Sequence, residues 1–182
     1  MRRTCSYAVA IAALSAVPAQ AQFMMPRLHI SAGVSADVPI GNLDTFANTG
    51  FGVAVRTESP LGGPEWGLRG GVSFDRMGGK DNTNVNYFEY LTFATELVHN
   101  TNPRTYQYAG VGIYQQKIVF EPVTTGFGFT TSAESESDFG FQGGVGLNFG
   151  TTVKTFLEIG VVDVLTTGKS SVWFPLRFGF RI

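Results

Sequence analysis

The chain has 182 residues, a formal net charge of −1, one cysteine and two histidines, together with 23 glycines, 16 phenylalanines and 6 tyrosines. A single cysteine excludes a disulfide scaffold, two histidines far apart exclude a zinc cluster, and the lack of a basic excess argues against nucleic acid as a partner. Glycine and aromatic residues are poor or middling helix formers, so the composition favours strands and turns. We predict neither a metal nor a cofactor.

The N-terminus has the pattern of a secretory signal peptide over residues 1–21. Arg2 and Arg3 precede a short apolar run, and an Ala-Gln-Ala sequence ends at Ala21. The apolar run is too short for a transmembrane helix. We expect cleavage near Ala21, which leaves residues 22–182 as one domain. Because two arginines leave with the peptide, the net charge falls from −1 to −3.

The first three predicted strands alternate with period two, the spacing of a strand that has one apolar and one polar face. They cover residues 28–37, 51–56 and 66–75. Small or polar residues such as Ser31 and Ser35 occupy the second face. The residues assigned to the apolar face are Leu28, Ile30, Ala32, Val34, Ala36, Phe51, Val53, Val55, Trp66, Leu68, Gly70, Val72 and Phe74.

Two middle strands, at 90–97 and 106–116, allow either assignment of their faces. In the first, only one assignment keeps Glu96 off the apolar face, and a charge facing lipid costs up to roughly 2–4 kcal/mol near the midplane. The outward residues are then Leu91, Phe93, Leu97, Ala109, Val111 and Ile113, and the inward residues are Tyr90, Thr92, Glu96, Tyr106, Tyr108 and Tyr114. For 106–114 the opposite assignment, with the tyrosines in the membrane interface, stays open.

Three further strands, at 138–149, 155–162 and 173–182, complete a set of eight. Each alternates in the same way, and about ten residues per strand matches a tilted transmembrane strand. Their apolar face contains Phe139, Phe141, Val145, Leu147, Phe149, Leu157, Ile159, Val161, Phe174, Leu176, Phe178, Phe180 and Ile182.

The connections between these strands alternate between long and short. They run over 38–49, 57–65, 76–86, 99–104, 117–137, 150–154 and 164–171. Short turns on the periplasmic side and longer loops on the outer side are expected of an up-and-down membrane barrel. The sequence therefore predicts an all-β fold, an eight-stranded antiparallel up-and-down transmembrane β-barrel.

The second face of the strands indicates that the polar side is the inside. It consists mostly of Gly, Ser, Ala, Thr, Gln and Asn, which is too sparsely charged for a water-exposed exterior but suits a narrow lumen. All the mid-strand charges take this inward face, and they are Arg56, Arg69, Glu96, Glu158, Arg177 and Arg181. We predict a lumen network in which the glutamates neutralise the arginines, because a buried charge is tolerated when it is paired.

The chain resembles the small outer-membrane β-barrel family of the OmpX and OmpA membrane-domain type. The resemblance rests on the signal peptide, the hairpin VPIGNLDTFANTGFGVAV, the strands YAGVGIY and FQGGVGLNFG, and the ending FPLRFGFRI. It implies a non-enzymatic integral protein of the Gram-negative outer membrane with a role in envelope integrity or surface interaction and adhesion. It also implies that the barrel-assembly machinery reads the last strand at Phe174, Leu176, Phe178, Phe180 and Ile182, although the family usually ends in Phe.

The sequence leaves two alternative functions open. LVHNTNP, which contains His99, loosely resembles the His-x-Ser of outer-membrane lipid A deacylases, but Thr101 replaces the serine and no carboxylate follows at a suitable distance to orient the base. His29 is expected to be a polar residue of the lumen. A secreted, soluble, lipocalin-like barrel that binds an apolar ligand is the third reading. We predict no catalytic residues.

Beyond lipid and the assembly machinery, the sequence suggests one further partner. The segment 117–137 keeps its alternation past the bilayer and predicts a projecting hairpin. A projecting edge can add a strand from an extracellular protein, and the alternative is a loop that shields the barrel. Trp66 and Trp173 are expected in the aromatic belts at the membrane interfaces.

Overall fold

The structure is a computed structural model that describes residues 28–125, 128–150, 154–166 and 169–182. The predicted signal peptide and its cleavage point near Ala21 lie outside the described residues. The elements are β1 (His29–Ile40), a 3-10 turn η1 (Leu43–Thr45), β2 (Ala47–Pro60), β3 (Trp66–Gly79), β4 (Val85–Asn100), β5 (Thr105–Phe120), β6 (Val123–Thr125), β7 (Gly128–Thr130), β8 (Ala133–Phe149), β9 (Lys154–Thr166) and β10 (Lys169–Arg181).

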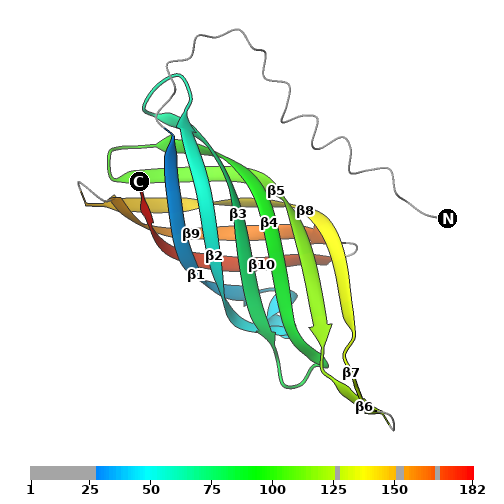
Figure 1. Cartoon of the computed structure of the whole chain (residues 1–182). Helices are drawn as coiled ribbons and strands as arrows, with labels where there is room; N and C mark the ends of the chain where they lie inside the picture. Colours follow the sequence, from blue (N-terminus) through cyan, green and yellow to red (C-terminus); the bar gives the residue numbers. More distant parts are fainter. Residues whose placement is uncertain (1–27, 126–127, 151–153, 167–168) are drawn as a thin grey trace, which may run out of the picture.

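Eight of these strands form one closed barrel in the order β1-β10-β9-β8-β5-β4-β3-β2 (Figure 1). Every neighbouring pair is antiparallel, and the first and last strands pair with each other. The two short strands β6 and β7 pair only with each other, at the tip of the β5–β8 connection. This arrangement confirms the predicted eight-stranded antiparallel up-and-down barrel.

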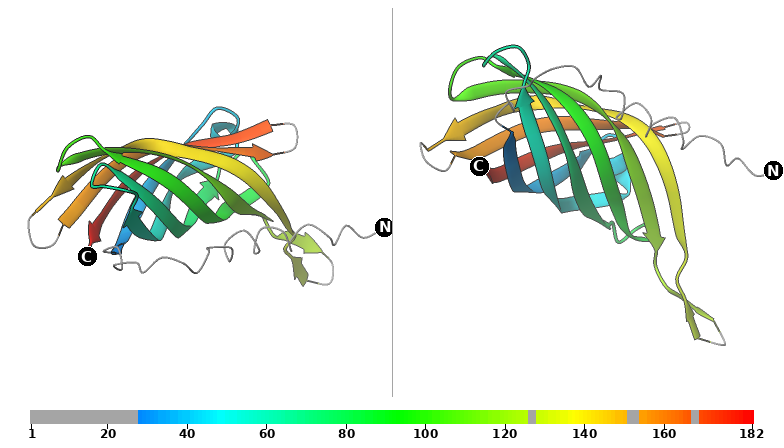
Figure 2. Two further views of the ribbon diagram at one scale, coloured as in Figure 1. Left: turned by 90° about the horizontal axis from the view of Figure 1, so that it is seen from above. Right: turned by 45° about the horizontal axis from the view of Figure 1, so that its top comes forward.

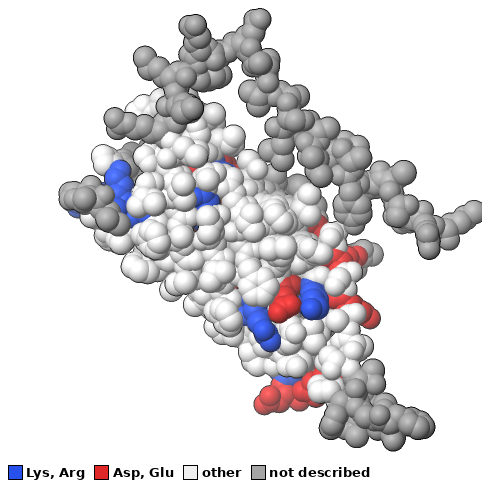
Figure 3. All heavy atoms as spheres, in the orientation of Figure 1, with Lys and Arg blue, Asp and Glu red and all other residues white. Residues whose placement is uncertain are grey.

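The apolar faces of the strands form the outside of the barrel. Large apolar side chains remain exposed along each of the eight barrel strands, for example Val34, Phe93, Ile159 and Phe178, while the alternate positions are mostly buried. Tyr106, Tyr108 and Tyr114 lie inside, so the inward assignment of β5 is confirmed. On the face shown in Figure 3, charged side chains gather toward the two ends and leave a band without charge between them.

The strands are longer, and the connections shorter, than the sequence predicts. Barrel strands have 12 to 17 residues rather than about ten. The predicted connection 57–65 shrinks to 61–65, because β2 continues to Pro60 and pairs with β3. Likewise, 38–49 shrinks to 41–46 and 76–86 to 80–84, while part of 164–171 lies outside the described residues. The alternation of apolar and polar residues continues beyond the bilayer, and the hydrogen-bonded pairing of the strands continues with it. The lengths predicted for the strands from the sequence pattern are therefore too short.

One end of the barrel extends beyond the rest. β5 and β8 are among the longest strands, and they run on together past the end of β9 toward the β6–β7 hairpin (Figure 2). The predicted projecting hairpin at 117–137 is therefore present, although most of it continues the barrel strands. The described residues contain no helix that is long and apolar enough to cross a membrane.

Candidate functional site

The centre of the lumen holds four charged side chains that bond to one another. Arg69 of β3 bonds through Nε to Glu96 of β4 and through Nη1 to Glu158 of β9, the latter at 2.6 Å. Arg56 of β2 also bonds to Glu158, at 2.7 Å. All four side chains are buried. Inward positions at the same height on the strands bring these residues together, although up to 102 residues separate them in sequence.

Neutral side chains complete the bonding of this quartet. Tyr106 donates its hydroxyl to Glu158 at 2.8 Å, and Gln142 donates its amide to Glu96 at 2.6 Å. Arg69 also lies over the ring of Tyr108, with Cζ 4.4 Å from the ring centroid. Each oxygen of both glutamates therefore accepts at least one bond, which is the condition under which a buried ion pair is tolerated.

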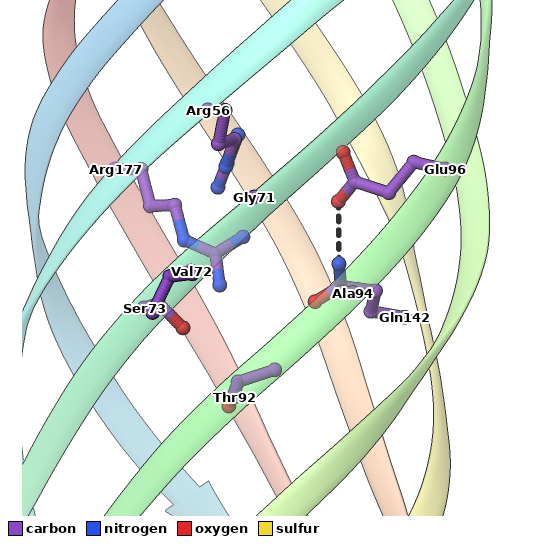
Figure 4. Close-up of a pocket in the computed structure, with 9 residues that line it drawn as sticks. All are labelled: Arg56, Gly71, Val72, Ser73, Thr92, Ala94, Glu96, Gln142 and Arg177. Carbon is purple, nitrogen blue, oxygen red and sulfur yellow. Dashed lines mark hydrogen bonds between the residues drawn. The ribbon is translucent and has the colours of Figure 1, made fainter. Parts of the chain in front are cut away.

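A small cavity adjoins the quartet (Figure 4). Glu96 and Gln142 line one side, Arg56, Arg177 and Ser73 line the other, and Thr92 lies at the lower end of the view. Its volume is about 10 Å³, which is enough for a single water molecule. The centre of the barrel is therefore filled by side chains, as expected for eight strands.

The six predicted network residues are all buried, but they do not form one cluster. Arg177 donates to the hydroxyl of Tyr108 at a long 3.5 Å. Arg181 pairs with Glu58 at 3.1 Å, closer to the turns, instead of with the two central glutamates. Glu58 was missed because the sequence pattern placed it in a connection. The alternation of inward and outward residues continues past Arg56, and this pattern indicates that Glu58 also faces inward.

The end of the lumen nearest η1 is closed by an apolar plug. Its members are buried, and they are Leu43, Ala47, Met77, Phe88, Tyr90, Tyr114, Val162, Val164 and Trp173. Trp173 packs against Tyr90 and Tyr114, with ring centroids 4.8 and 6.1 Å away. The prediction that Trp173 lies in an interface belt is wrong. It precedes the outward Phe174, so the alternation of β10 directs its side chain into the barrel.

The opposite, turn end of the lumen opens into a pocket of about 700 Å³. His29, Glu58 and Arg181 are among the residues that line it. His99 stacks on Trp66, with ring centroids 4.4 Å apart, and contacts Gln107 through Nδ1 at 3.2 Å. In the part of the chain that the structure describes, no carboxylate or hydroxyl bonds to the His99 ring, and no group of three or more His, Cys, Asp or Glu residues could hold a metal ion.

The final strand closes the barrel. Ile182 and Ile30 exchange two backbone hydrogen bonds, of 2.8 and 2.9 Å. The five residues of the predicted assembly signal, Phe174, Leu176, Phe178, Phe180 and Ile182, all point outward and are exposed. Trp66 is also exposed on the outer surface, near the turn end.

An exterior that is apolar, a lumen that is charged and filled, and a closed antiparallel sheet together define the fold class of small eight-stranded transmembrane barrels. No family model and no curated protein matches the chain. Solved structures with this fold include Ail, the attachment invasion locus protein of Yersinia pestis, with a TM-score of 0.61 and 15% identity over 85% of this chain and 97% of Ail.

Two further structures agree with this assignment. The N-terminal barrel domain of Pseudomonas aeruginosa OprF has a TM-score of 0.57 and 10% identity, and covers 85% of this chain and 97% of the domain. Neisserial surface protein A has a TM-score of 0.51 and 13% identity, and covers 85% of this chain and 96% of its own. At these identities the likeness is one of fold.

Proposed function

We propose that this chain is an integral, non-enzymatic protein of the outer membrane of a diderm bacterium and that it binds an extracellular partner through its projecting end. The observation that carries the location is the inverted distribution of polarity, with apolar side chains outside and paired charges inside. A closed barrel leaves no backbone group unpaired in lipid, and outward apolar residues are what the hydrocarbon core requires.

The same distribution argues against a soluble, lipocalin-like barrel. Such a barrel buries its apolar face and encloses room for an apolar ligand. Here the lumen centre has a cavity of only about 10 Å³ among charged groups. The contiguous apolar exterior would also drive aggregation in water.

The proposal includes roles for two further sets of residues. Trp66 anchors the barrel at the membrane interface on the turn side, and the outward residues of β10 are recognised by the barrel-assembly machinery.

The enzyme alternative has less support. A lipid A deacylase needs a base beside an activated hydroxyl, with a third group that orients the base. His99 instead stacks on Trp66 and contacts an amide. Its position at the turn end, away from the projecting end, also separates it from lipid of the outer leaflet.

The binding role rests on an open strand edge in β8. Residues 133–138 pair with β5, whereas pairing with β9 begins only at Phe139. Among the described residues, no strand pairs with 133–138 on the other side. An edge of this kind can accept a strand from another protein.

The backbone groups that face this edge can be identified. Phe120 donates to the carbonyl of Ser132, so 120 and 132 form a hydrogen-bonded pair of the β5–β8 ladder. Such pairs alternate in an antiparallel ladder, so Glu134 and Glu136 bond to β5, while Ser135 and Ser137 direct their N–H and C=O groups to the open edge. The two glutamates beside the edge favour a partner strand that carries lysine or arginine.

Localisation is tested by fractionating cells that express the full chain and running the outer-membrane fraction on gels with and without heating. We expect the protein in that fraction, with a heat-modifiable shift in mobility. Recovery of the protein freely soluble in periplasm or medium would contradict the proposal. Unchanged lipid A mass spectra on overexpression are expected as well, and a deacylated species would favour the enzyme.

The binding role is tested by attachment of these cells to cultured epithelial cells. Ser135→Pro removes an edge donor without removing a β5–β8 bond, so we expect a folded barrel and at least a tenfold loss of attachment. Ser135→Ala is the matched control and should attach normally. Attachment that is unchanged in Ser135→Pro, with heat modifiability intact, would show that the edge is not the site.

A further inference from the structure

The mouth of the lumen at the projecting end contains a hollow of about 450 Å³, which we call the cup. The cup lies on the outer side of the apolar plug, and Leu43 and Phe88 of the plug line it. Phe46 and Ile118 add further apolar surface. Its volume falls within the range of about 300–1,000 Å³ that is typical of ligand pockets. The cup is therefore large enough to receive a bulky group from outside.

The cup is continuous with the open edge of β8. A second hollow, of about 400 Å³, runs along this edge and is lined by Gln116, Ile118, Glu134, Ser135 and Glu136. Three of these residues, Gln116, Ile118 and Glu136, also line the cup. Among the described residues, the pairing of β8 with β9 stops at Phe139 and Leu165, and β8 runs on without a neighbour on that side (Figure 2). A strand added to the edge would therefore lie beside the cup.

The pairing pattern of the edge determines which side chains of an added strand enter the cup. Because Ser135 and Ser137 direct their backbone groups to the edge, Glu134 and Glu136 would form non-hydrogen-bonded pairs with the added strand. Opposite side chains are closest in such pairs. The partner residue opposite Glu136 therefore points into the cup, and the residue two positions away lies opposite Glu134.

The walls of the cup favour an aromatic residue that also carries a hydrogen-bond donor. Leu43, Phe88 and Ile118 offer apolar contacts. Gln116 is only 7% exposed, and its side chain makes no hydrogen bond within the part of the chain that the structure describes. Its amide oxygen can accept an N–H from a group in the cup. Tryptophan combines a large apolar ring with one N–H donor.

We propose that the extracellular partner adds a strand to the edge of β8 and inserts a tryptophan of that strand into the cup. A lysine or arginine two residues from the tryptophan then pairs with Glu134. Glu136 is exposed, so its carboxylate can remain in water at the rim while the ring contacts the apolar walls. This inference rests on the strand addition proposed above, and it specifies which partner strand the edge selects.

The test measures the binding of fluorescein-labelled peptides by fluorescence anisotropy. Protein purified from outer membranes is placed in phospholipid nanodiscs. In the probe peptide, threonine alternates with lysine, tryptophan and lysine in turn, so the pattern is the same in either strand direction. In the comparison peptide, alanine replaces the tryptophan. We expect the tryptophan peptide to bind about tenfold more tightly, because a buried aromatic anchor commonly contributes this much to an interface.

Four variants assign this preference to the cup and the edge. Ile118→Trp fills the cup with a ring of the protein itself, so it should bind both peptides only as tightly as the wild type binds the alanine peptide. Gln115→Trp, the same change on the outer face of β5, is the matched control and should keep the preference. Phe46→Ala removes an exposed wall and provides a second route if Ile118→Trp folds poorly. Ser135→Pro should lose both peptides. Heat modifiability shows that each variant is folded.

The outcomes separate the cup from the edge. Equal binding of the two peptides to the wild type, with loss of both in Ser135→Pro, would overturn the inference and leave strand addition intact. A preference that persists in both Ile118→Trp and Phe46→Ala would place the ring elsewhere and would also overturn it. Undiminished binding of both peptides to Ser135→Pro would contradict strand addition itself. If neither peptide binds the wild type while cells attach normally, the partner is of another kind and the inference is wrong.

Discussion

The two halves of the lumen have the same wall but are stabilised in opposite ways. From the centre toward the turns, the interior holds paired charges, which are the central quartet of Arg56, Arg69, Glu96 and Glu158 and then the Arg181–Glu58 pair. Toward η1, Trp173 and its neighbours fill it with apolar and aromatic groups. A charge-filled interior is stable only while each group keeps its partner, whereas an apolar interior depends on volume. Single substitutions should therefore have different signatures in the two halves.

The largest effect is expected from Glu158→Ala. It leaves Arg56 without its ion-pair partner and takes one of two from Arg69. We expect a loss of about 3–5 kcal/mol in the free energy of unfolding, measured by urea titration in detergent. Glu58→Ala is the comparison, because it breaks a single pair beside the open pocket and should cost less. Equal losses would contradict a special role for the centre.

Trp173→Ala should cost about 3 kcal/mol, because it opens a cavity in the plug. Trp173→Phe, which keeps a ring against Tyr90, should cost clearly less. Fluorescence provides an independent measurement: in a Trp66→Phe background, the remaining Trp173 should be shielded from aqueous quenchers. Emission that is readily quenched would indicate that Trp173 lies in an interface belt.

Tyr106→Phe sharpens the comparison within the charged half. It removes one donor to Glu158 while the arginines stay in place. A hydrogen bond to a charged group contributes about 1.5–3 kcal/mol, so we expect a loss near 1.5 kcal/mol in the same urea titration. Tyr87→Phe, outside the lumen, is the matched control and should be neutral. A neutral Tyr106→Phe would mean that this hydroxyl does not support the quartet.

The smallest effect is expected from Glu89→Gln on the projecting end. Glu89 is 3.7 Å from Arg76 and 3.8 Å from Lys117, both of which are exposed. Exposed pairs contribute about 0.2–1 kcal/mol and are weakened by salt. The urea midpoint should change little at low salt and not at all at high salt. A loss as large as that of Glu158→Ala would show that exposure does not distinguish the two sites.

Much of the barrel was predictable because alternation reports the face of each residue directly. One charge, Glu96, was enough to orient β4, and the inward tyrosines of β5 followed the same pattern. At Trp173 the general preference of tryptophan for membrane interfaces conflicts with the inward parity of its strand, and the buried side chain follows the parity. Parity is the stronger constraint, since a side chain cannot leave its face without a change of register.

The partners inside the lumen were less accessible to sequence. Which inward residues meet depends on the stagger between strands, and Ser35, Gly52 and Asp75 come together only through two ladders. Asp37 and Asp75 both follow the inward parity of their strands and are buried, yet their proximity depends on the register between strands. Leu43 belongs to the plug but lies in a 3-10 turn. The sequence there has no periodic pattern from which its burial could be predicted.

The pairing of Ile30 with Ile182 closes the sheet between the first and last strands and therefore places a constraint on assembly. These residues lie at opposite ends of the described chain, so the contact that completes the cylinder is also the most distant in sequence. Until it forms, the chain is an open ribbon with two unsatisfied edges, and a bilayer offers those edges no water. The unpaired edges of the open sheet must therefore stay shielded from lipid until β10 pairs with β1, and this pairing completes the barrel.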